Sequence, residues 1–438
     1  MRVASLLFLA FAACGCSSVP VADTLEIRHA TVIDPGSGTV TANRCIRISG
    51  DTITGIVDCD PTPDIASVDA RGRWVIPGLW DMHVHAVWHE DVYETFFDEF
   101  IRFGVVGIRD MGGKLDVLQQ ARWYLEQPDV IGPFLVAPGP FLDGPEPINP
   151  SLSLALESYQ DGVRAVRTLA ARGVDFVKLY TLLPKDAALG AMAEAKRQGL
   201  PVVGHLPASL DLDTALQHGM SGIEHMAVEV GGLCDAGDTA DPCSAVFDRL
   251  KKARVALTPT LIVRERRTEL DMSGILELAR IDDMPEIVAE DWLARREHAL
   301  GELSPEEWAA RRLQFVQEQA LTARAIREDA LLLAGTDAGD LFVPPGASLH
   351  DELALLVEAG MSEMRALRAA TADATAVLGL SERGAIRKGA TADLVILRSD
   401  PLQDIKNTRD IESVIVSGNL VPPRPPARTE RAPARSPR

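Results

Sequence analysis

The sequence has 438 residues, enough for one large α/β barrel or for two to three ordinary domains. Its 44 basic and 63 acidic side chains give a net charge of −19, which disfavours binding to nucleic-acid phosphates, so we expect no nucleic-acid partner. A hydrophobic content of 46% with 24% charged residues excludes a largely disordered chain and a multi-span membrane protein.

The N-terminus predicts a secretory signal. Arg2 precedes an apolar run of about ten residues, too short to span a hydrocarbon layer of ~30 Å, so we assign residues 1–13 to a signal peptide and expect export to the periplasm. The segment "FAAC" resembles a bacterial lipobox, which predicts membrane attachment by a lipid anchor through Cys14, with Cys16 as a second candidate. Ordinary cleavage after Ala12 is the alternative.

Four further cysteines follow the signal region. Disulfides persist outside the cytoplasm, and each pair of cysteines flanks one local unit, so we expect the disulfides Cys45–Cys59 and Cys234–Cys243. Free buried thiols are one alternative. Thiolate ligation of a metal is another, although neither pair has the close spacing of a zinc site.

Two separated regions predict one small sheet. Residues 25–74 alternate between apolar and polar side chains, with turn signals at "DPGSG" and "SGD", and residues 390–421 contain two more strand-like runs, "ADLVIL" and "SVIVSGNLV". We therefore predict a composite β-sheet domain built from both ends of the chain.

Between these regions, residues 75–389 alternate short apolar strands with helical stretches. The strand-like runs are "WVIPGLWDMHVHA", "GVVGIRD", "GPFLVAPG", "VDFVKLY", "LPVVGHL", "SGIEHM", "RVALTPTLIV" and "ALLLAGTD". Alternation of this kind predicts parallel pairing, and eight units close a TIM-type barrel. The predicted fold class is α/β, a (β/α)8 TIM-type barrel with the small composite sheet.

Three segments fall outside that repeat. Residues 264–330 are dense in Arg and Glu with helical periodicity, which predicts an inserted helical subdomain covering the site; a solvated appendage is the alternative. Helices are predicted at 349–360 and 362–378. The Pro- and Arg-rich residues 422–438 predict a disordered tail.

Histidines and one aspartate fall at the ends of several predicted strands. His83 and His85 are two residues apart, so both side chains face the same side of a strand. His205, His225 and Asp337 end later strands, where barrel enzymes build their active sites. A single histidine at such a place is more often structural, but the coincidence of five residues indicates a metal site.

Lys178 lies inside the apolar run "VDFVKLY", where an unpaired ammonium would lose several kcal/mol of hydration. The segments "PGLWDMHVH", "VDFVKLY", "VVGHLP", "GIEHM" and "LAGTDAG" resemble the amidohydrolase superfamily, in the branch of imidazolonepropionase-like proteins and of dipeptidases acting on Xaa-Pro, Xaa-Arg or Xaa-Lys. The resemblance extends from Leu25 to about Val421.

This resemblance implies a binuclear metal centre. It assigns one ion to His83, His85 and Asp337 and the other to His205 and His225. The lysine, carboxylated on its amine, would bridge both ions, because a carbamate anion offers two oxygens where an ammonium would repel cations. A lysine paired with a carboxylate, a lysine reaching solvent, and a single ion with an unmodified lysine are the alternatives.

The implied reaction is hydrolysis by a hydroxide that bridges two divalent ions, with zinc expected for a histidine-rich site and manganese or iron left open. Asp337 would take the proton of the water and pass it to the leaving amine. One ion would polarise the carbonyl. The substrate class is a small amide or peptide, such as a dipeptide or an N-acyl amino acid; a cyclic amide or lactone is the alternative, and a noncatalytic binding lipoprotein a third hypothesis.

Weaker candidates adjoin these segments. Tyr180 lies on the same strand face as Lys178 and could donate a hydrogen bond to the oxyanion, or be structural. His350 follows the eighth predicted strand and could contact substrate, or cap or pack a helix. Arg109 and Asp110 could pair with each other or bind a substrate carboxylate. A homo-oligomer is also expected.

Overall fold

The computed structural model describes residues 24–61, 65–226, 230–235 and 241–421. The predicted signal peptide, Cys14, Cys16 and the predicted tail at 422–438 lie outside these residues. Within the described part of the chain, none of the helices has both the length and the apolar character needed to cross a membrane.

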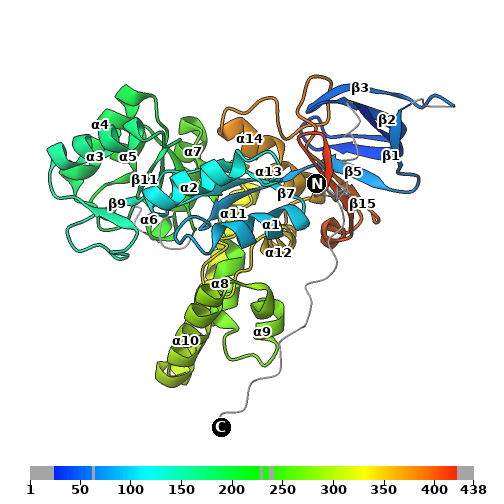
Figure 1. Ribbon diagram of the computed structural model, residues 1–438. Helices are drawn as coiled ribbons and strands as arrows, with labels where there is room; N and C mark the ends of the chain where they lie inside the picture. Colours follow the sequence, from blue (N-terminus) through cyan, green and yellow to red (C-terminus); the bar gives the residue numbers. More distant parts are fainter. Residues whose placement is uncertain (1–23, 62–64, 227–229, 236–240, 422–438) are drawn as a thin grey trace, which may run out of the picture.

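Strands from both ends of the chain form one sheet at one end of the molecule (Figure 1). Its order is β17-β16-β15-β5-β1-β2-β3, and β4 pairs with β1. The central pairing of β1 with β2 is antiparallel. Its strands are β1 (Thr24–Asp34), β2 (Thr39–Ser49), β3 (Thr52–Asp58), β4 (Ala66–Asp69), β5 (Trp74–Pro77), β15 (Leu394–Leu397), β16 (Ile411–Val416) and β17 (Asn419–Val421).

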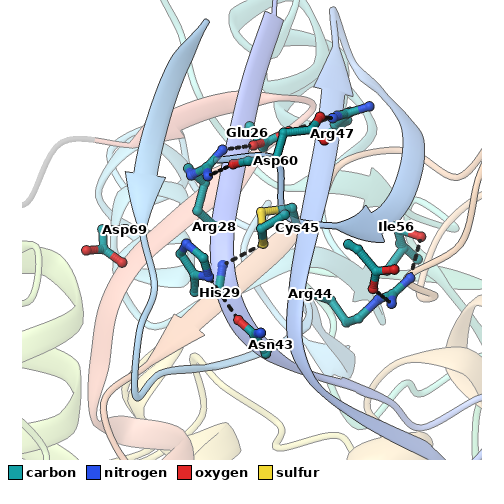
Figure 2. The surroundings of a disulfide bond; sticks show 12 residues. Glu26, Arg28, His29, Asn43, Arg44, Cys45, Arg47, Ile56, Asp60 and Asp69 are labelled. Carbon is teal, nitrogen blue, oxygen red and sulfur yellow. Dashed lines mark hydrogen bonds and ion pairs between the residues drawn. A yellow bond between two sulfur atoms is a disulfide. The ribbon is translucent and has the colours of Figure 1, made fainter. Parts of the chain in front are cut away.

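This sheet also contains the first disulfide. Cys45 in β2 is bonded to Cys59, which confirms the predicted pairing. Figure 2 shows the bond beside the buried Glu26, which pairs with Arg28 and with Arg47. The second predicted disulfide, Cys234–Cys243, is also present, joining α6 (Gly232–Asp235) to α7 (Pro242–Ala253).

The rest of the strands form two parallel sheets. One has the order β6-β7-β8 and the other β10-β9-β11-β12-β13-β14. The strands are β6 (Leu79–Val84), β7 (Val105–Asp110), β8 (Phe134–Val136), β9 (Phe141–Asp143), β10 (Ser153–Ala155), β11 (Val177–Leu179), β12 (Val202–Gly204), β13 (Met220–Glu224) and β14 (Ala256–Thr258). The helices that accompany them are α1 (Tyr93–Arg102), α2 (Leu115–Leu125), α3 (Tyr159–Ala171), α4 (Lys185–Gln198) and α5 (Leu212–Gln217). The α/β class is confirmed, and β9 and β10 are additional to the predicted strands.

The eighth predicted strand lies between the two parallel sheets without being a regular strand. Leu331 accepts a hydrogen bond from the Leu257 amide of β14, and Ala334 accepts one from the Met82 amide of β6. A side chain at Gly335 would clash, because its Cβ would lie 2.8 Å from the backbone nitrogen of His83. These contacts bring the segment close to both sheets, while closure into a barrel stays a prediction.

The segment predicted as an insertion is helical, and α10 and α9 extend away from the body of the molecule (Figure 1). Its helices are α8 (Leu261–Thr268), α9 (Ile275–Leu278), a 3-10 turn (Ile281–Asp283), α10 (Glu286–Glu302) and α11 (Pro305–Arg327). The ring centroids of Trp292 and Phe342 lie 5.6 Å apart. By contrast, Leu313, one of the apolar residues on which the helix prediction rests, is 58% exposed. After this segment come α12 (Ala347–Glu358), α13 (Glu363–Ala369), α14 (Ala372–Val377) and a 3-10 turn (Ile405–Arg409).

Candidate metal centre

Side chains from the ends of different parallel strands meet in one buried cluster. His83 is the penultimate residue of β6. Its ring centroid lies 5.5 Å from that of His85 and 4.8 Å from that of His225, which follows β13. The ring of His205, directly after β12, is 5.1 Å from that of His225. The four histidines predicted as ligands are therefore neighbours.

Asp337 completes this cluster from the segment between the sheets. Its Oδ1 atom lies 3.3 Å from Nε2 of His83 and 3.2 Å from Nε2 of His85. One ligand atom each from His83, His225 and Asp337 lie within 4.8 Å of one another, a spacing that a single metal ion can bridge.

Each of the four histidines has an oxygen partner for its Nδ1 atom. Nδ1 of His83 lies 2.9 Å from Oε2 of Glu224, and Nδ1 of His85 lies 3.0 Å from the carbonyl oxygen of Gly112. A carbonyl oxygen only accepts, so His85 carries its proton on Nδ1 and a lone pair on Nε2. Proteins commonly orient a metal-ligating histidine by a hydrogen bond from its other ring nitrogen to a carboxylate or a carbonyl oxygen.

The other two histidines are held by threonine hydroxyls. Nδ1 of His225 lies 2.6 Å from Oγ1 of Thr260, which itself donates to the Pro259 carbonyl at 2.7 Å. Because the hydroxyl proton is already used, the hydroxyl accepts from His225, and Nε2 of His225 keeps its lone pair. Nδ1 of His205 lies 2.8 Å from Oγ1 of Thr181.

This donor arrangement fits a divalent cation. Nε2 of His83 is buried and forms no hydrogen bond with the residues that the structure describes. With Nδ1 of His83 and His85 protonated toward their partners, two lone pairs and the Asp337 carboxylate face one another, and a positive charge is needed between them. Burial lowers the pKa of His85, but Asp337 outweighs this and raises it.

The remaining histidines are suited to binding metal as neutral rings. Burial holds the pKa of both His205 and His225 well below the usual value, so neither is protonated at neutral pH. For Asp337 burial favours the neutral acid, yet His83 and His85 outweigh burial and hold its pKa well below the usual range. His205 and His225 therefore present neutral imidazoles and Asp337 an ionised carboxylate, which are the forms that bind metals.

Lys178 lies in β11 with 1% of its surface exposed, and its Nζ is 4.6 Å from the ring centroid of Phe141. Among the described residues, no carboxylate lies within ion-pair distance of this amine. The alternatives of a solvent-reaching lysine and of a carboxylate-paired lysine are therefore wrong. Burial lowers the pKa of Lys178 to about 8. Burial is the main cause that lowers the pKa of His205, and the charge of Lys178 lowers it further.

Glu224 is a site residue that our sequence reasoning missed. It is fully buried, and its Oε1 atom accepts a 2.7 Å hydrogen bond from Arg109, while Oε2 contacts His83. Arg109 also donates to the Met82 carbonyl at 2.7 Å. The prediction that Arg109 pairs with Asp110 or binds a substrate carboxylate is therefore wrong, because Glu224 and the backbone occupy its guanidinium.

Two other buried carboxylates hold the backbone around the cluster. Asp110 accepts hydrogen bonds from the amides of Ala86 and Val87, which directly follow His85. Asp81 accepts from the amide and hydroxyl of Thr336, next to Asp337, and burial raises its pKa to about 7. These bonds fix the backbone next to the predicted ligands His85 and Asp337.

Tyr180 lies at the edge of the cluster, whereas both ring nitrogens of His350 are already used in hydrogen bonds with other residues. The Tyr180 ring stacks on His205 with centroids 4.2 Å apart, and burial raises its pKa to about 12. Both ring nitrogens of His350 are occupied, Nδ1 by the Thr408 hydroxyl at 2.8 Å and Nε2 by the Phe103 carbonyl at 3.1 Å. With 1% of its surface exposed, His350 fits the packing interpretation, and its prediction as a catalytic residue is corrected.

Two residues of the cluster have an unusual backbone. His225 and Asp337 both have φ of 66°, in the left-handed region that few side chains adopt. Conformations of this kind are costly and gather at functional sites, where the surrounding bonds hold them.

Comparison with known proteins gives relatives along most of the chain. Ochratoxinase of Aspergillus niger is 24% identical over 457 residues, covering 89% of this chain and 84% of that protein. A dihydroorotase of Anaeromyxobacter sp. is 41% identical over 66 residues, or 15% of each chain.

Solved structures show the same fold. Bottromycin amidohydrolase has a TM-score of 0.72 at 25% identity, covering 92% of this chain and 88% of that one. A Xaa-Pro dipeptidase with bound methionine has a TM-score of 0.70 at 20% identity, covering 91% of this chain and 99% of that one. The model of the Amidohydrolase family matches residues 74–421. That match begins at β5, ends with β17 and includes every element that carries the cluster, and the chain belongs to the amidohydrolase family.

Proposed function

We propose that this protein is a metal-dependent hydrolase that cleaves the amide or peptide bond of a small substrate. The observation that carries the proposal is the set of four neighbouring histidines, each with Nδ1 held by an oxygen, together with the Asp337 carboxylate that contacts two of them. The names of similar proteins, an amidohydrolase, a Xaa-Pro dipeptidase and ochratoxinase, support cleavage of carbon–nitrogen bonds.

We propose two divalent ions, with zinc expected, and a carboxylated Lys178. His83, His85 and Asp337 would hold one ion and His205 and His225 the other. The burial of Lys178 and the lack of a carboxylate partner for it among the described residues support a carbamate, because CO2 adds to the neutral amine with loss of one proton and yields an anion. A carbamate would satisfy this buried position better than an ammonium.

Divalent ions bound here would lower the pKa of a water and polarise the substrate carbonyl. Asp337, held ionised by His83 and His85, takes the proton of the attacking water and returns it to the leaving nitrogen. Tyr180, kept protonated by burial, donates a hydrogen bond to the oxygen that becomes negatively charged. Glu224 and Thr260 keep the histidine rings in place.

The remaining predictions extend this proposal. The eighth predicted strand, which lies in space between β14 and β6, would close an eight-stranded barrel. The strands of residues 25–74 and 390–421 would form a separate sheet domain. The two disulfides are compatible with export. Periplasmic location, anchoring through Cys14 and a homo-oligomeric state stay part of the proposal.

The test is to purify the full mature chain with zinc and bicarbonate, to count metal per chain by mass spectrometry, and to screen dipeptides and N-acyl amino acids for amine release. Lys178→Ala should lose metal and activity, whereas the exposed Lys185→Ala should keep both. Cleavage of cyclic amides or lactones alone would refute the peptidase proposal. An unchanged activity in Lys178→Ala would refute the binuclear mechanism.

A further inference from the structure

A small cavity lies between α8 and α11, the helices of the inserted segment that pack on each other. Its volume is about 210 Å³, and its lining includes Arg264 and Arg267 from α8 and Arg311, Gln314 and Glu318 from α11. Arg264 and Arg267 share one face of α8, because they are three positions apart. Arg311 lines the same cavity from α11.

Two connections lead from α8, which lines this cavity, to the metal centre. α8 begins directly after Thr260, whose hydroxyl contacts Nδ1 of His225 at 2.6 Å. Arg267 pairs with Asp340, whose amide donates a 3.0 Å hydrogen bond to the Asp337 carbonyl. Burial is the main cause of the low pKa of His205 and His225, and the positive charge of Arg264 lowers both further.

The charges lining this cavity are not balanced. Asp340 is shared between Arg267 and Arg295, the latter at 2.7 Å. Arg311 has no carboxylate within ion-pair distance among the residues described, and its guanidinium lies 5.6 Å from the ring centroid of Trp308. One arginine is thus free to bind an anion.

Buried polar atoms in the cavity also lack partners. Glu318 is fully buried, and its Oε2 forms no hydrogen bond with the described residues, nor does Nε of Arg264, which lies 3.4 Å from Oε1 of Glu318. A buried polar atom without a partner costs free energy, which a bound polar group can recover. Nε of Arg264 is a donor whose hydrogen a carboxylate can accept, whereas Oε2 of Glu318 is an acceptor that a carboxylate cannot satisfy. The cavity therefore offers a free positive charge and one unpartnered donor.

We propose that this cavity binds the carboxylate of the substrate, with Arg311 as the residue that pairs with it. The inference rests on the proposed amide hydrolysis and narrows its substrates to N-acyl amino acids and peptides with a free carboxylate. An arginine fork matches a carboxylate with two parallel hydrogen bonds, which a neutral amide does not offer. On a chain with a net charge of −19, such a pocket also gives anionic substrates a local site of attraction.

The experiment compares each substrate with its uncharged analogue. N-acetyl-L-phenylalanine, N-acetyl-L-leucine and N-acetyl-L-proline are paired with their C-terminal methylamides, and acetate release is measured for both. Binding of each acid and methylamide to the metal-loaded protein is measured separately by calorimetry. The wild type should prefer at least one acid over its methylamide by about 10-fold or more, as expected for a charge-assisted hydrogen bond.

Variants of two adjacent arginines give the matched control. Arg311→Gln should raise the KM and Kd of the preferred acid by about 10-fold, keep kcat and leave the methylamide unchanged. Arg311→Lys should restore part of the affinity. Arg312→Gln, at an exposed position 3.9 Å from Asp271, should change neither ligand.

The outcomes separate the two proposals. If acids bind through Arg311 while no amide is cleaved, the carboxylate site stands and the proposed hydrolysis fails. If amides are cleaved but no acid is preferred, or if Arg311→Gln affects acid and methylamide equally, the carboxylate site is wrong.

Discussion

Oε2 of Glu224 lies 2.9 Å from Nδ1 of His83, and Oε1 of the same carboxylate accepts a 2.7 Å hydrogen bond from Arg109. One buried side chain thus orients a proposed metal ligand and neutralises a buried guanidinium. Both partners depend on its negative charge.

Replacing Glu224 should therefore affect metal binding and stability together. Glu224→Gln leaves Arg109 buried without a counter-charge, and we expect a loss of about 3–5 kcal/mol in the free energy of unfolding. Zinc affinity should fall by about 10–100-fold because the ring of His83 is no longer held by a carboxylate. Glu194→Gln, which breaks a pair with Arg197, is the control: it should leave zinc affinity unchanged. Equal zinc affinity in both variants would contradict the role of Glu224.

Lys178 should make the stability of the metal-free protein depend on pH. Its pKa is lowered to about 8 in the folded chain from 10.5, so between these values the unfolded chain binds more protons and stability rises with pH. Below pH 8 the folded protein bears the full cost of the buried charge. Lys178→Met should remove that slope and stabilise the metal-free, bicarbonate-free protein at pH 7 by about 1–3 kcal/mol.

Urea unfolding between pH 7 and pH 10.5 measures this effect. The same substitution should abolish zinc retention, because a thioether provides no bridging anion. A Lys178→Met variant that is destabilised at pH 7, or that shows the wild-type slope, would show that the amine is already compensated in the folded chain.

The hydroxyl of Thr260 should contribute more to zinc affinity than its methyl group does. Thr260→Ala removes the acceptor of the His225 Nδ1 proton, so the ring can take the other tautomer, and we expect a loss of about 10-fold in zinc affinity. Thr260→Ser keeps the hydroxyl and should stay within about twofold of the wild type. Competition with a chromophoric zinc chelator measures the difference, and equal losses in both variants would indicate packing as the cause.

Tyr180→Phe tests the proposed hydrogen bond to the reacting oxygen. The phenyl ring can keep the stack on His205, so we expect kcat to fall by about 10–100-fold with little change in KM. His350→Asn is the contrast: two buried hydrogen bonds are disturbed, and we expect lower stability with wild-type kcat below the unfolding temperature. A kcat for Tyr180→Phe within twofold of the wild type would leave the tyrosine a packing role only.

Much of the cluster could be predicted because its chemistry is visible locally. His83 and His85 share a strand face by the two-residue period, and His205, His225 and Asp337 each follow an apolar run. Lys178 could be predicted as a functional residue because its charged side chain lies inside such an apolar run. The same signal, a charged residue within an apolar run, is present at Glu224 in "SGIEHM", where the neighbouring histidine is the more obvious candidate for a metal site.

Other features depend on contacts far apart in the sequence. His350 is held by Thr408 and Phe103, which are 58 and 247 residues away, so its local sequence carries no sign of its role. Likewise, the exposure of Leu313 depends on which helices pack beside α11. The eighth predicted strand has the apolar pattern of a strand, but its path turns at Gly335 and Asp337, where contacts with His83 determine the backbone.

The left-handed backbone of Asp337 and His225 has a consequence for judging which relatives are active. Asp, Asn, His and Gly tolerate this conformation best, so the backbone alone restricts substitution at both positions. A relative that had lost catalysis would still be under selection to keep such residues there. Retention of Lys178, which no backbone requirement protects, is therefore the more informative sign that a relative still turns over substrate.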